Sequence, residues 1–344
     1  MKLLLVTNIH EPLSLISGGG MERSSHFFIT MLAKYLENRS LGLSVSVFSH
    51  SDSLIPNCFD HIESSFENVD SKYNEFGDGK AKWNIYAGEK SVLGLADGLS
   101  KFDVVHDMSS LFSLPFICNQ FSIPYLRTLR LMPYHPVYKL TAEKCAFQVF
   151  LSYYQASFVN QNISKFEIIP DFIESKSNRA IHIKDEYCVI VGRVETRKGI
   201  NESLEICRYL NLKAVIIGKI TDENYYNTLL HDYKEKVIFT GYLKHENVLE
   251  KISKAKFLVW TPSVPEPGGR VVLESLCAGT SVIANYNGYA ADIVNKNNDL
   301  NNSFKLMNTV YYILHPSNIS LNTEETFIGR YIEIYNSIKK QWKY

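Results

Sequence analysis

The stretch KFLVWTPSVPEPGGRVVLESLCAG, residues 256–279, carries the strongest structural signal in the chain. Its apolar run FLVW predicts a buried strand of a parallel sheet, because helices cover both faces of such a sheet. The PEPGG segment, residues 265–269, predicts a turn, and VVLESLCA predicts a short, mostly buried helix. A strand, a turn and a helix in this order are typical of doubly wound α/β folds, whose ligands lie beyond the carboxyl ends of the strands.

The same alternation of short apolar runs and longer amphipathic stretches extends along the whole chain and predicts repeated βαβ units. In the first half we expect five strands, over residues 2–8, 43–49, 102–106, 124–128 and 147–152. A helix is expected over residues 22–36, because apolar side chains recur there at helical spacing. The alternation restarts at Tyr187 with YCVIVG, KAVIIG, KVIFTG and KFLVW, where about six βα units are expected.

Domain boundaries follow from a change in composition. The polar, charged passage IIPDFIESKSNRAIHIKDE, residues 168–186, is the best linker candidate. We expect a first domain over residues 1–170, a second over residues 171–325, and a closing amphipathic helix over residues 326–344 that docks on a domain. The polar passage over residues 51–82 has little periodicity and predicts a long surface excursion.

The composition of the 344 residues is that of a globular protein, with 45% apolar and 21% charged residues. Lys plus Arg and Asp plus Glu both number 36, so the broad positive surface of a nonspecific nucleic-acid-binding protein is not expected. The opening MKLLLVTN is too short for a signal peptide, and no apolar run approaches the ~18 residues of a membrane span. We therefore expect a soluble, cytoplasmic protein.

The six cysteines lie 19 or more positions apart, some of them within apolar segments. They form neither a CxxC pair nor a Cys/His spacing suited to zinc, so reduced, mostly buried thiols are expected. A DxD pair of carboxylates that could hold Mg²⁺ on a diphosphate is also missing from the sequence. No metal site is expected.

The segment SGGGMERS, residues 17–24, places three glycines between the first strand and its helix. Glycines there let the backbone approach a ligand, and a helix N-terminus favours an anion. The segment lacks GxGxxG spacing, and no acidic residue ends the second strand, so a dinucleotide oxidoreductase fits poorly. A tight turn without a ligand stays open as the alternative.

The segment GRVETRKG, residues 192–199, directly follows the strand that opens the second domain. Arg193 and Lys198 lie on this connection, five positions apart, and can converge on one polyanion such as a diphosphate. A structural salt bridge is the alternative for either residue.

Two carboxylates, Glu266 and Glu274, are eight positions apart in the PEPGG turn and the helix after it. Even a wholly helical path separates them by roughly 12 Å, which is too far for the acid and nucleophile of a glycosidase. They can instead hold hydroxyls at opposite ends of an extended ligand, with a diphosphate between them at the helix N-terminus. That description fits a sugar nucleotide; a turn residue and a solvated helix residue are the alternative.

Together these motifs resemble the retaining glycosyltransferases of the GT-B fold, in particular family four of the sequence classification. The matching elements, in the order of that family, are GGMERS, DVVHD, IPDFIE, GRVETRKG, VIFTGYL, EPGGRVVLE, LCAGTSVIA and NGYAADIV. The resemblance implies two Rossmann-like domains that face a central cleft, with the acceptor bound by the first domain and a nucleotide sugar by the second.

The resemblance also implies roles for individual residues. Glu266, Arg193 and Lys198 would be catalytic, because the two cations take up leaving-group charge while Glu266 faces the donor sugar and Glu274 the ribose. The implied donor-binding residues are Gly19, Gly20, Arg193, Lys198, Gly241, Tyr242, Glu266, Pro267, Gly268, Gly269, Arg270, Val271 and Glu274. Neither a metal nor another cofactor is implied, and a UDP-sugar is the default donor substrate.

Two departures from the family pattern concern the first domain and the sugar pocket. Arg130 stands where the family usually carries a histidine that contacts the donor sugar, and His135 is a nearby substitute. His106, at a strand end, is a third candidate contact of the first domain, although a lone histidine there is more often structural. Gly268 replaces a bulkier residue and is expected to widen the sugar pocket.

The resulting hypothesis is transfer of a hexose-type sugar from a nucleotide diphosphate sugar to a hydroxyl acceptor, with retained configuration. Arg127, Arg130, Lys139 and Lys144 against Glu143 give a local positive excess. This excess suits a lipid-linked saccharide in surface polysaccharide synthesis and a peripheral contact with the inner face of the membrane; an ordinary solvated face is the alternative. Two other functions stay open: a sugar-nucleotide epimerase and a catalytically silent sugar-nucleotide-binding partner.

Overall fold

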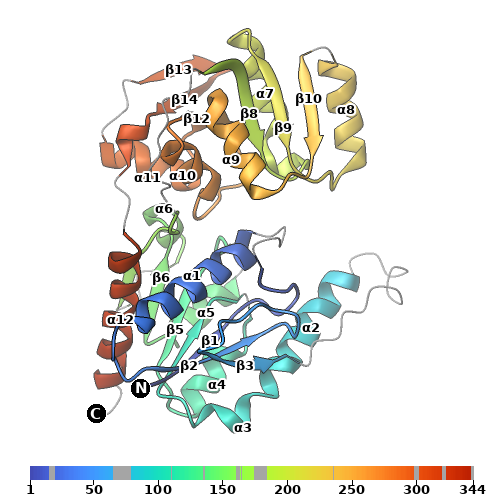
Figure 1. The fold of residues 1–344 in the computed structure, drawn as a ribbon. Coiled ribbons are helices and arrows are strands. Elements are labelled where there is room, and N and C mark those ends of the chain that lie inside the picture. The colour runs from blue at the N-terminus through green and yellow to red at the C-terminus, as the bar shows by residue number, and fades with distance from the viewer. Residues whose placement is uncertain are drawn as a thin grey trace. The chain divides into compact units, whose positions relative to one another are not determined.

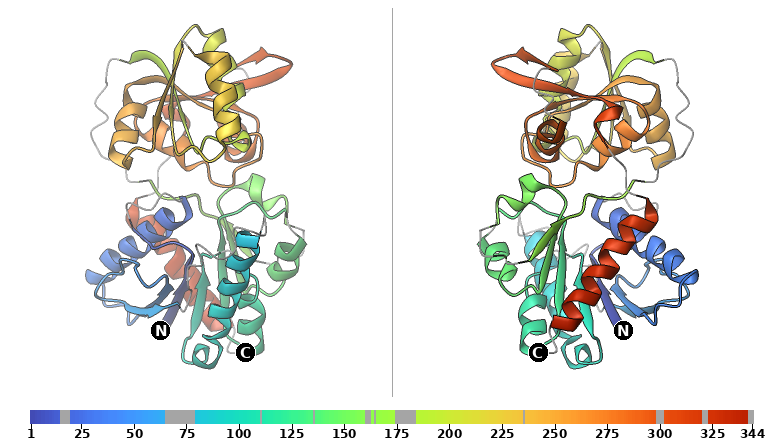
Figure 2. Two further views of the ribbon diagram at one scale, coloured as in Figure 1. Left: turned by 90° about the vertical axis from the view of Figure 1, so that its right-hand side faces the viewer. Right: turned by 90° about the vertical axis from the view of Figure 1, so that its left-hand side faces the viewer.

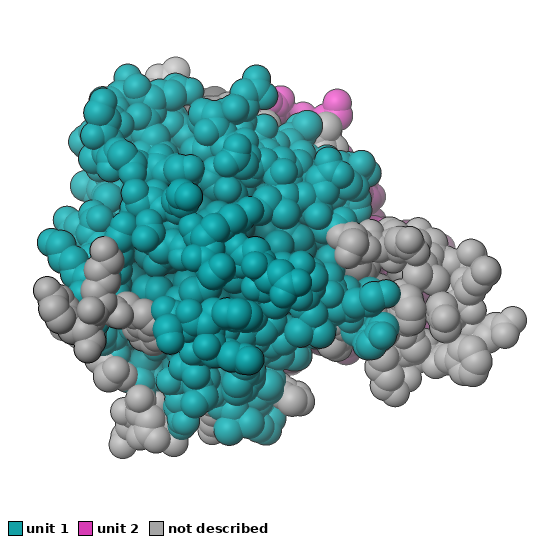
Figure 3. Space-filling view, turned by 90° about the horizontal axis from the view of Figure 1, so that it is seen from below, with its two compact units in different colours: residues 1–151, 156–172, 322–344 teal, residues 152–155, 173–321 magenta. Residues whose placement is uncertain are grey.

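In a computed structural model the chain forms two compact units, each built around one sheet (Figure 1). The first unit comprises residues 1–151, 156–172 and 322–344, and the second comprises residues 152–155 and 173–321 (Figure 3). The structure describes residues 1–14, 20–64, 79–109, 111–134, 136–159, 163, 165–173, 184–234, 236–297, 302–319 and 323–341.

The sheet of the first unit has seven parallel strands in the order β3-β2-β1-β4-β5-β6-β7. They are β1 (Lys2–Val6), β2 (Ser44–Ser49), β3 (Asp60–Glu63), β4 (Val104–Asp107), β5 (Tyr125–Leu129), β6 (Phe147–Phe150) and β7 (Phe166–Ile168). Each of the five predicted strands is present. The edge strand β3 was missed, because such a short, half-exposed segment lacks a continuous apolar run.

Helices of the first unit are α1 (Gly20–Glu37), α2 (Gly79–Leu93), α3 (Ala96–Leu99), α4 (Leu114–Gln120), α5 (Pro136–Ala142) and α12 (Glu324–Gln341). The short helix α6 (Tyr153–Ala156) lies where the chain passes between the units. The expected surface excursion over residues 51–82 is wrong in part, since it contains β3 and the first turn of α2. Residues 65–78 of that passage lie outside the described residues.

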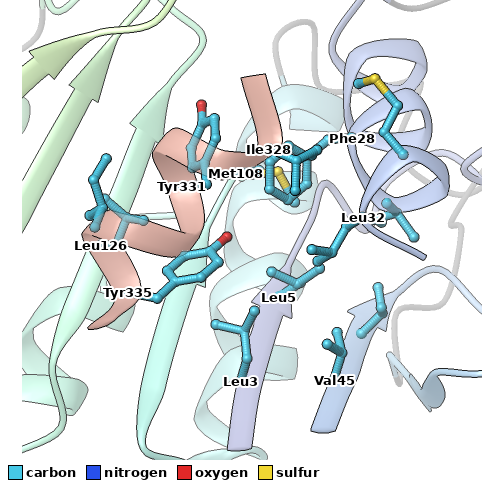
Figure 4. Packing of buried hydrophobic residues seen from close by; sticks show 14 of the residues in the cluster. Leu3, Leu5, Phe28, Leu32, Val45, Met108, Leu126, Ile328, Tyr331 and Tyr335 are labelled. Atoms are coloured by element: carbon cyan, nitrogen blue, oxygen red, sulfur yellow. The ribbon is translucent and has the colours of Figure 1, made fainter. Parts of the chain in front are cut away.

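Helices α1 and α12, from the two ends of the chain, pack side by side on the first sheet (Figure 2). The apolar face expected for the closing helix is buried in the first unit, from Phe327 to Ile338. Figure 4 shows Tyr331 and Tyr335 of α12 in one cluster with Phe28 of α1 and Leu5 of β1. This cluster is therefore completed only by the last helix of the sequence.

The sheet of the second unit has the order β10-β9-β8-β11-β12-β14-β13. Its strands are β8 (Asp185–Val191), β9 (Lys213–Ile217), β10 (Val237–Gly241), β11 (Ala255–Trp260), β12 (Ser281–Asn285), β13 (Ser303–Leu306) and β14 (Thr309–Leu314). Its longer helices are α7 (Ile200–Tyr209), α8 (Glu223–Tyr233), α9 (His245–Lys254), α10 (Arg270–Cys277) and α11 (Gly288–Asn297).

Two apolar cores cover the two faces of this sheet. Side chains of α9, α10 and α11 belong to one core, and side chains of α7 and α8 belong to the other. Five βα units are present among the described residues, where about six were expected. The chain then forms the antiparallel hairpin of β13 and β14, which turns at Met307 and Asn308, both with positive φ. In both units together, no described helix is long and apolar enough to cross a membrane.

Candidate functional site

The predicted donor-site residues of the second unit gather at the carboxyl edge of its sheet. Gly192 and Arg193 follow β8, Tyr242 follows β10, and Glu266 lies on the connection from β11 to α10. Because these strands are parallel, their carboxyl ends share one edge, where doubly wound sheets bind ligands. The strand order thus brings together residues up to 74 positions apart.

Lys198 is held at this edge by a close contact between two connections. It ends the 3₁₀ turn η2 (Thr196–Lys198), and Gly199 follows with φ of 61°. A Cβ at Gly199 would lie 1.7 Å from the carbonyl oxygen of Thr261, so only glycine fits. The Thr261 hydroxyl also donates to the carbonyl of Gly199 over 3.0 Å. The backbone beside Lys198 is therefore fixed against the end of β11.

Glu266 is held from the other side. Its carbonyl accepts a hydrogen bond of 3.1 Å from the backbone N–H of Tyr289 at the start of α11. A Cβ at Gly288, where φ is 53°, would lie 2.4 Å from the Glu266 carbonyl oxygen, so this approach also requires glycine. From these two anchored positions the Lys198 Nζ and Glu266 Oε1 atoms meet at 2.6 Å.

Arg193, the second predicted cation, has a different partner. Its Nη2 lies 3.1 Å from Oε1 of Glu195, and its side chain is 58% exposed. Gly241, the last residue of the edge strand β10, has φ of 69°, and the side chain of Tyr242 after it is half exposed. The side chains of Arg193 and Tyr242 are thus accessible to solvent at the edge of the sheet that carries Lys198.

Glu274 lies on α10, which begins after Gly269 as N-cap. The first N–H groups of a helix have no acceptor within the helix and favour an anion. Only 5% of Glu274 is exposed, so the alternative of a solvated helix residue is wrong. Its Oε1 lies 3.0 Å from Nε of Arg270 and 3.6 Å from Nε2 of His245.

His245 was not predicted as part of this site. It opens α9, 29 positions before Glu274, and its side chain is 22% exposed. A single histidine at a helix start carries no spacing signal, and only the packing of α9 against α10 brings it to the carboxylate. Pro267 and Gly268 complete the turn before α10, and the effect of Gly268 on a sugar pocket stays a prediction.

His106 of the first unit is a core residue. It is fully buried in β4, where Nδ1 lies 2.7 Å from the Tyr335 hydroxyl and Nε2 lies 2.8 Å from Oγ1 of Thr128. Burial, together with the nearby Arg130 guanidinium, lowers the pKa of His106 to about 3. The predicted ligand contact of His106 is wrong, because α12 covers the face of the sheet to which this side chain points.

Arg130 follows β5 and is 8% exposed. Its Nη1 lies 2.5 Å from Oδ1 of Asp171, whose Oδ2 accepts a hydrogen bond of 3.2 Å from Ser24 of α1. The Nε of Arg130 has no partner among the described residues. Gly20 opens α1 and is exposed, whereas Gly19 and His135 lie outside the described residues.

The local positive excess expected near residue 130 is not a surface feature. Arg127 is 1% exposed and donates to Thr141 over 2.9 Å and to Gln148 over 3.3 Å inside the first unit. Arg130 is buried as well, so two of the four counted cations do not face solvent. A count of charges along the sequence ignores the direction in which β5 points its side chains.

A cavity of about 350 Å³ lies in the second unit at the amino ends of β9 and β10. Leu204 and Cys207 line it from α7, and Tyr233 lines it from α8. None of the predicted donor-site residues contributes to it. We do not assign the donor to this cavity, because doubly wound sheets bind ligands at the opposite, carboxyl ends of their strands. Among the described residues, no three His, Cys, Asp or Glu side chains are grouped to hold a metal ion.

The segment that carries this site is similar to known proteins. Residues 171–304 match the family model described as glycosyl transferases group 1. This part of the chain is similar to that family, and it includes Arg193, Lys198, Glu266 and Glu274. Within the chain, 131 residues are also 34% identical to an uncharacterized glycosyltransferase of Methanocaldococcus jannaschii. That match covers 35% of this chain and 33% of the relative, so the chain matches about a third of that relative's length.

Solved structures share the fold of this chain over most of its length. AviGT4, a glycosyltransferase involved in avilamycin A biosynthesis, has a TM-score of 0.64 and 16% identity over 98% of both chains. Sucrose-phosphate synthase from Thermosynechococcus elongatus has a TM-score of 0.64 and 17% identity, covering 85% of this chain and 83% of its own. HepE of Anabaena, in complex with UDP and glucose, has a TM-score of 0.58 and 15% identity, covering 86% and 83%. The chain therefore has the GT-B architecture, with two Rossmann-like domains.

Proposed function

We propose that this protein is a nucleotide-sugar-dependent glycosyltransferase whose second unit binds the donor. One observation carries the proposal: the parallel sheet brings Lys198, Glu266 and the N-terminus of α10 to the same carboxyl edge, in a region of the group 1 family. Cations and helix N–H groups at such an edge suit a diphosphate, and the carboxylates suit hydroxyls on either side of it.

The chemistry follows from where charge develops. As the bond between the sugar and the diphosphate breaks, negative charge grows on the leaving phosphate oxygens. Lys198, Arg193 and the first N–H groups of α10 would stabilise that charge, which is catalysis by preorganised electrostatics. Glu266 would orient the sugar through its hydroxyls, and Glu274 would hold the ribose.

We propose a UDP-sugar with a hexose as donor, and retention of anomeric configuration. Support comes from the HepE structures, which contain UDP, glucose and UDP-glucose. The acceptor is a hydroxyl compound that binds mainly to the first unit. A lipid-linked saccharide is our preferred acceptor, because Leu131, Tyr134 and Leu140 expose 41%, 48% and 61% of their surfaces near α5 and offer apolar contact to a membrane-bound molecule.

A catalytically silent sugar-nucleotide-binding partner is favoured by one feature, the engagement of Arg130 with Asp171 where the family usually places a histidine. A screen of thermal stability against UDP-, GDP- and ADP-sugars tests the common part of both proposals, because a ligand of the native state raises the melting temperature. Product analysis with a lipid-linked acceptor then separates them: the transferase releases UDP and forms a glycosylated acceptor, whereas the silent partner forms neither. Stabilisation by no nucleotide sugar would contradict both.

A further inference from the structure

The Lys198 and Glu266 side chains hold each other at the centre of the proposed donor site. Their charged atoms lie 2.6 Å apart, and the two side chains are 27% and 28% exposed. A Cβ at Gly192 would lie 3.5 Å from Cδ of Lys198, so the stem of the lysine runs along the end of β8 before it reaches Glu266. The lysine stem is thus packed against the end of β8, and both side chains of the pair are partly shielded from solvent.

We propose that Glu266 is an internal competitor of the donor diphosphate for Lys198. In this exchange the diphosphate takes the ammonium, and the released carboxylate becomes available to accept hydrogen bonds from the sugar. The inference rests on the proposed function, because it concerns the same donor site. It states that the diphosphate binds Lys198 first and that the sugar then binds the released Glu266.

Charge decides the direction of the exchange. An ammonium is a compact charge with three donors, and a diphosphate offers it more negative charge and more oxygens than one carboxylate does. The Arg193–Glu195 pair does not act in this way, because the arginine side chain is 58% exposed and its ion pair is largely screened by water. A carboxylate therefore competes with the diphosphate mainly at Lys198 and not at Arg193.

A consequence for specificity follows from the exchange. While Glu266 Oε1 accepts from Lys198, that oxygen is less available to sugar hydroxyls, so a free sugar without a diphosphate gains less from the site. The pairing makes sugar recognition conditional on the nucleotide, and Glu266 takes part in both steps.

Calorimetric measurement of UDP affinity in a double-mutant cycle tests this inference. Glu266→Gln removes the competing charge and is expected to tighten UDP binding by about 3- to 10-fold, the range for one partly screened charge pair. In a Lys198→Met background the same substitution should change UDP affinity by less than about 2-fold, because no ammonium remains to be released. UDP-glucose should not share the gain, since it loses the Glu266 contacts to the sugar.

Glu250→Gln is the matched control. It breaks another pair of 2.6 Å, with Lys254 on α9, whose side chains are 58% and 43% exposed, and it should leave UDP affinity unchanged. An unchanged or weaker UDP affinity in Glu266→Gln, or an equal gain in both backgrounds, would overturn the exchange while leaving the donor site in place. If UDP, GDP and ADP all fail to bind the wild-type protein, the proposed function fails and the exchange with it. Should Glu266→Gln fold poorly, Glu266→Ala serves the same cycle.

Discussion

His106 Nδ1 lies 2.7 Å from the hydroxyl of Tyr335, which comes 229 positions later in the chain. The hydrogen bond joins β4 in the middle of the first sheet to α12 at the C-terminus, and both residues are fully buried. Since Thr128 satisfies the other ring nitrogen, the imidazole is held neutral between two elements of the core. The first unit therefore depends on the last helix for a buried polar contact as well as for apolar packing.

This burial predicts a specific loss of stability in acid. Because the pKa of His106 is lowered to about 3 in the folded chain from 6.5, protonation favours the unfolded chain. The contribution of neutral His106 to the free energy of unfolding is complete above pH 6.5 and is lost as the pH falls toward 3, on the order of 5 kcal/mol for the full range. Urea unfolding of the wild type and of His106→Gln between pH 7 and 4 measures this change in the free energy of unfolding. The wild type should lose more stability than the variant, and parallel curves would contradict the assignment.

We predict a second loss of stability when the buried ion pair of Arg130 and Asp171 is broken. Their side chains are 4% and 10% exposed, so Arg130→Met leaves a buried carboxylate without its cation. We expect the free energy of unfolding to fall by about 3 kcal/mol, as for other broken buried pairs. Arg39→Met is the control, because its partner Glu325 is 70% exposed and the loss should be below about 1 kcal/mol. Equal losses in both variants would mean that the Arg130 pair is not a structural contact.

Gly199→Ala tests the anchor of Lys198. An alanine there would place Cβ 1.7 Å from the Thr261 carbonyl oxygen at a positive φ, so the connection must move. Destabilisation of about 2 kcal/mol or more is expected, together with weaker UDP binding. Gly98→Ala in α3 meets no atom within 4 Å and should be neutral or slightly stabilising. Normal UDP affinity in Gly199→Ala would show that the position of Lys198 does not matter for the nucleotide.

Turnover tests the role of Glu266 apart from its pairing with Lys198. Glu266→Ala removes the carboxylate proposed to orient the sugar, and we expect the rate of UDP release from UDP-glucose in the presence of acceptor to fall at least ~100-fold. UDP itself should still bind, which distinguishes this loss from unfolding. Wild-type turnover in this variant would rule out the proposed sugar contact.

The carboxyl edge of the second sheet could be predicted from the sequence as the location of the site residues. Apolar runs mark the strands, and the carboxyl ends of parallel strands share one edge. Arg193, Lys198 and Glu266 were placed there by their positions just after such runs. The partners of these residues could not be predicted in the same way. Lys198 meets Glu266 across 68 positions, and only the contact of Gly199 with Thr261 and of Gly288 with Glu266 sets that distance.

The first unit shows where local patterns fail. His106 and Arg127 looked accessible as polar residues near strand ends, yet α12 covers the first and α5 contributes Thr141 to the second. Both burials depend on contacts between elements far apart in the chain. The hairpin of β13 and β14 was missed: β13 has only four residues, and the apolar run VYYIL of β14 was not assigned to a strand.

Hydrogen exchange of the full chain with and without UDP tests the central claim most directly, namely that the donor nucleotide binds at the carboxyl edge of the second sheet. We predict slower exchange in residues 192–199 and in residues 265–273 when UDP is present, since these segments carry Lys198, Glu266 and the N-terminus of α10. Protection confined to residues 204–214 and 231–237, which line the cavity at the amino ends of the strands, would contradict it.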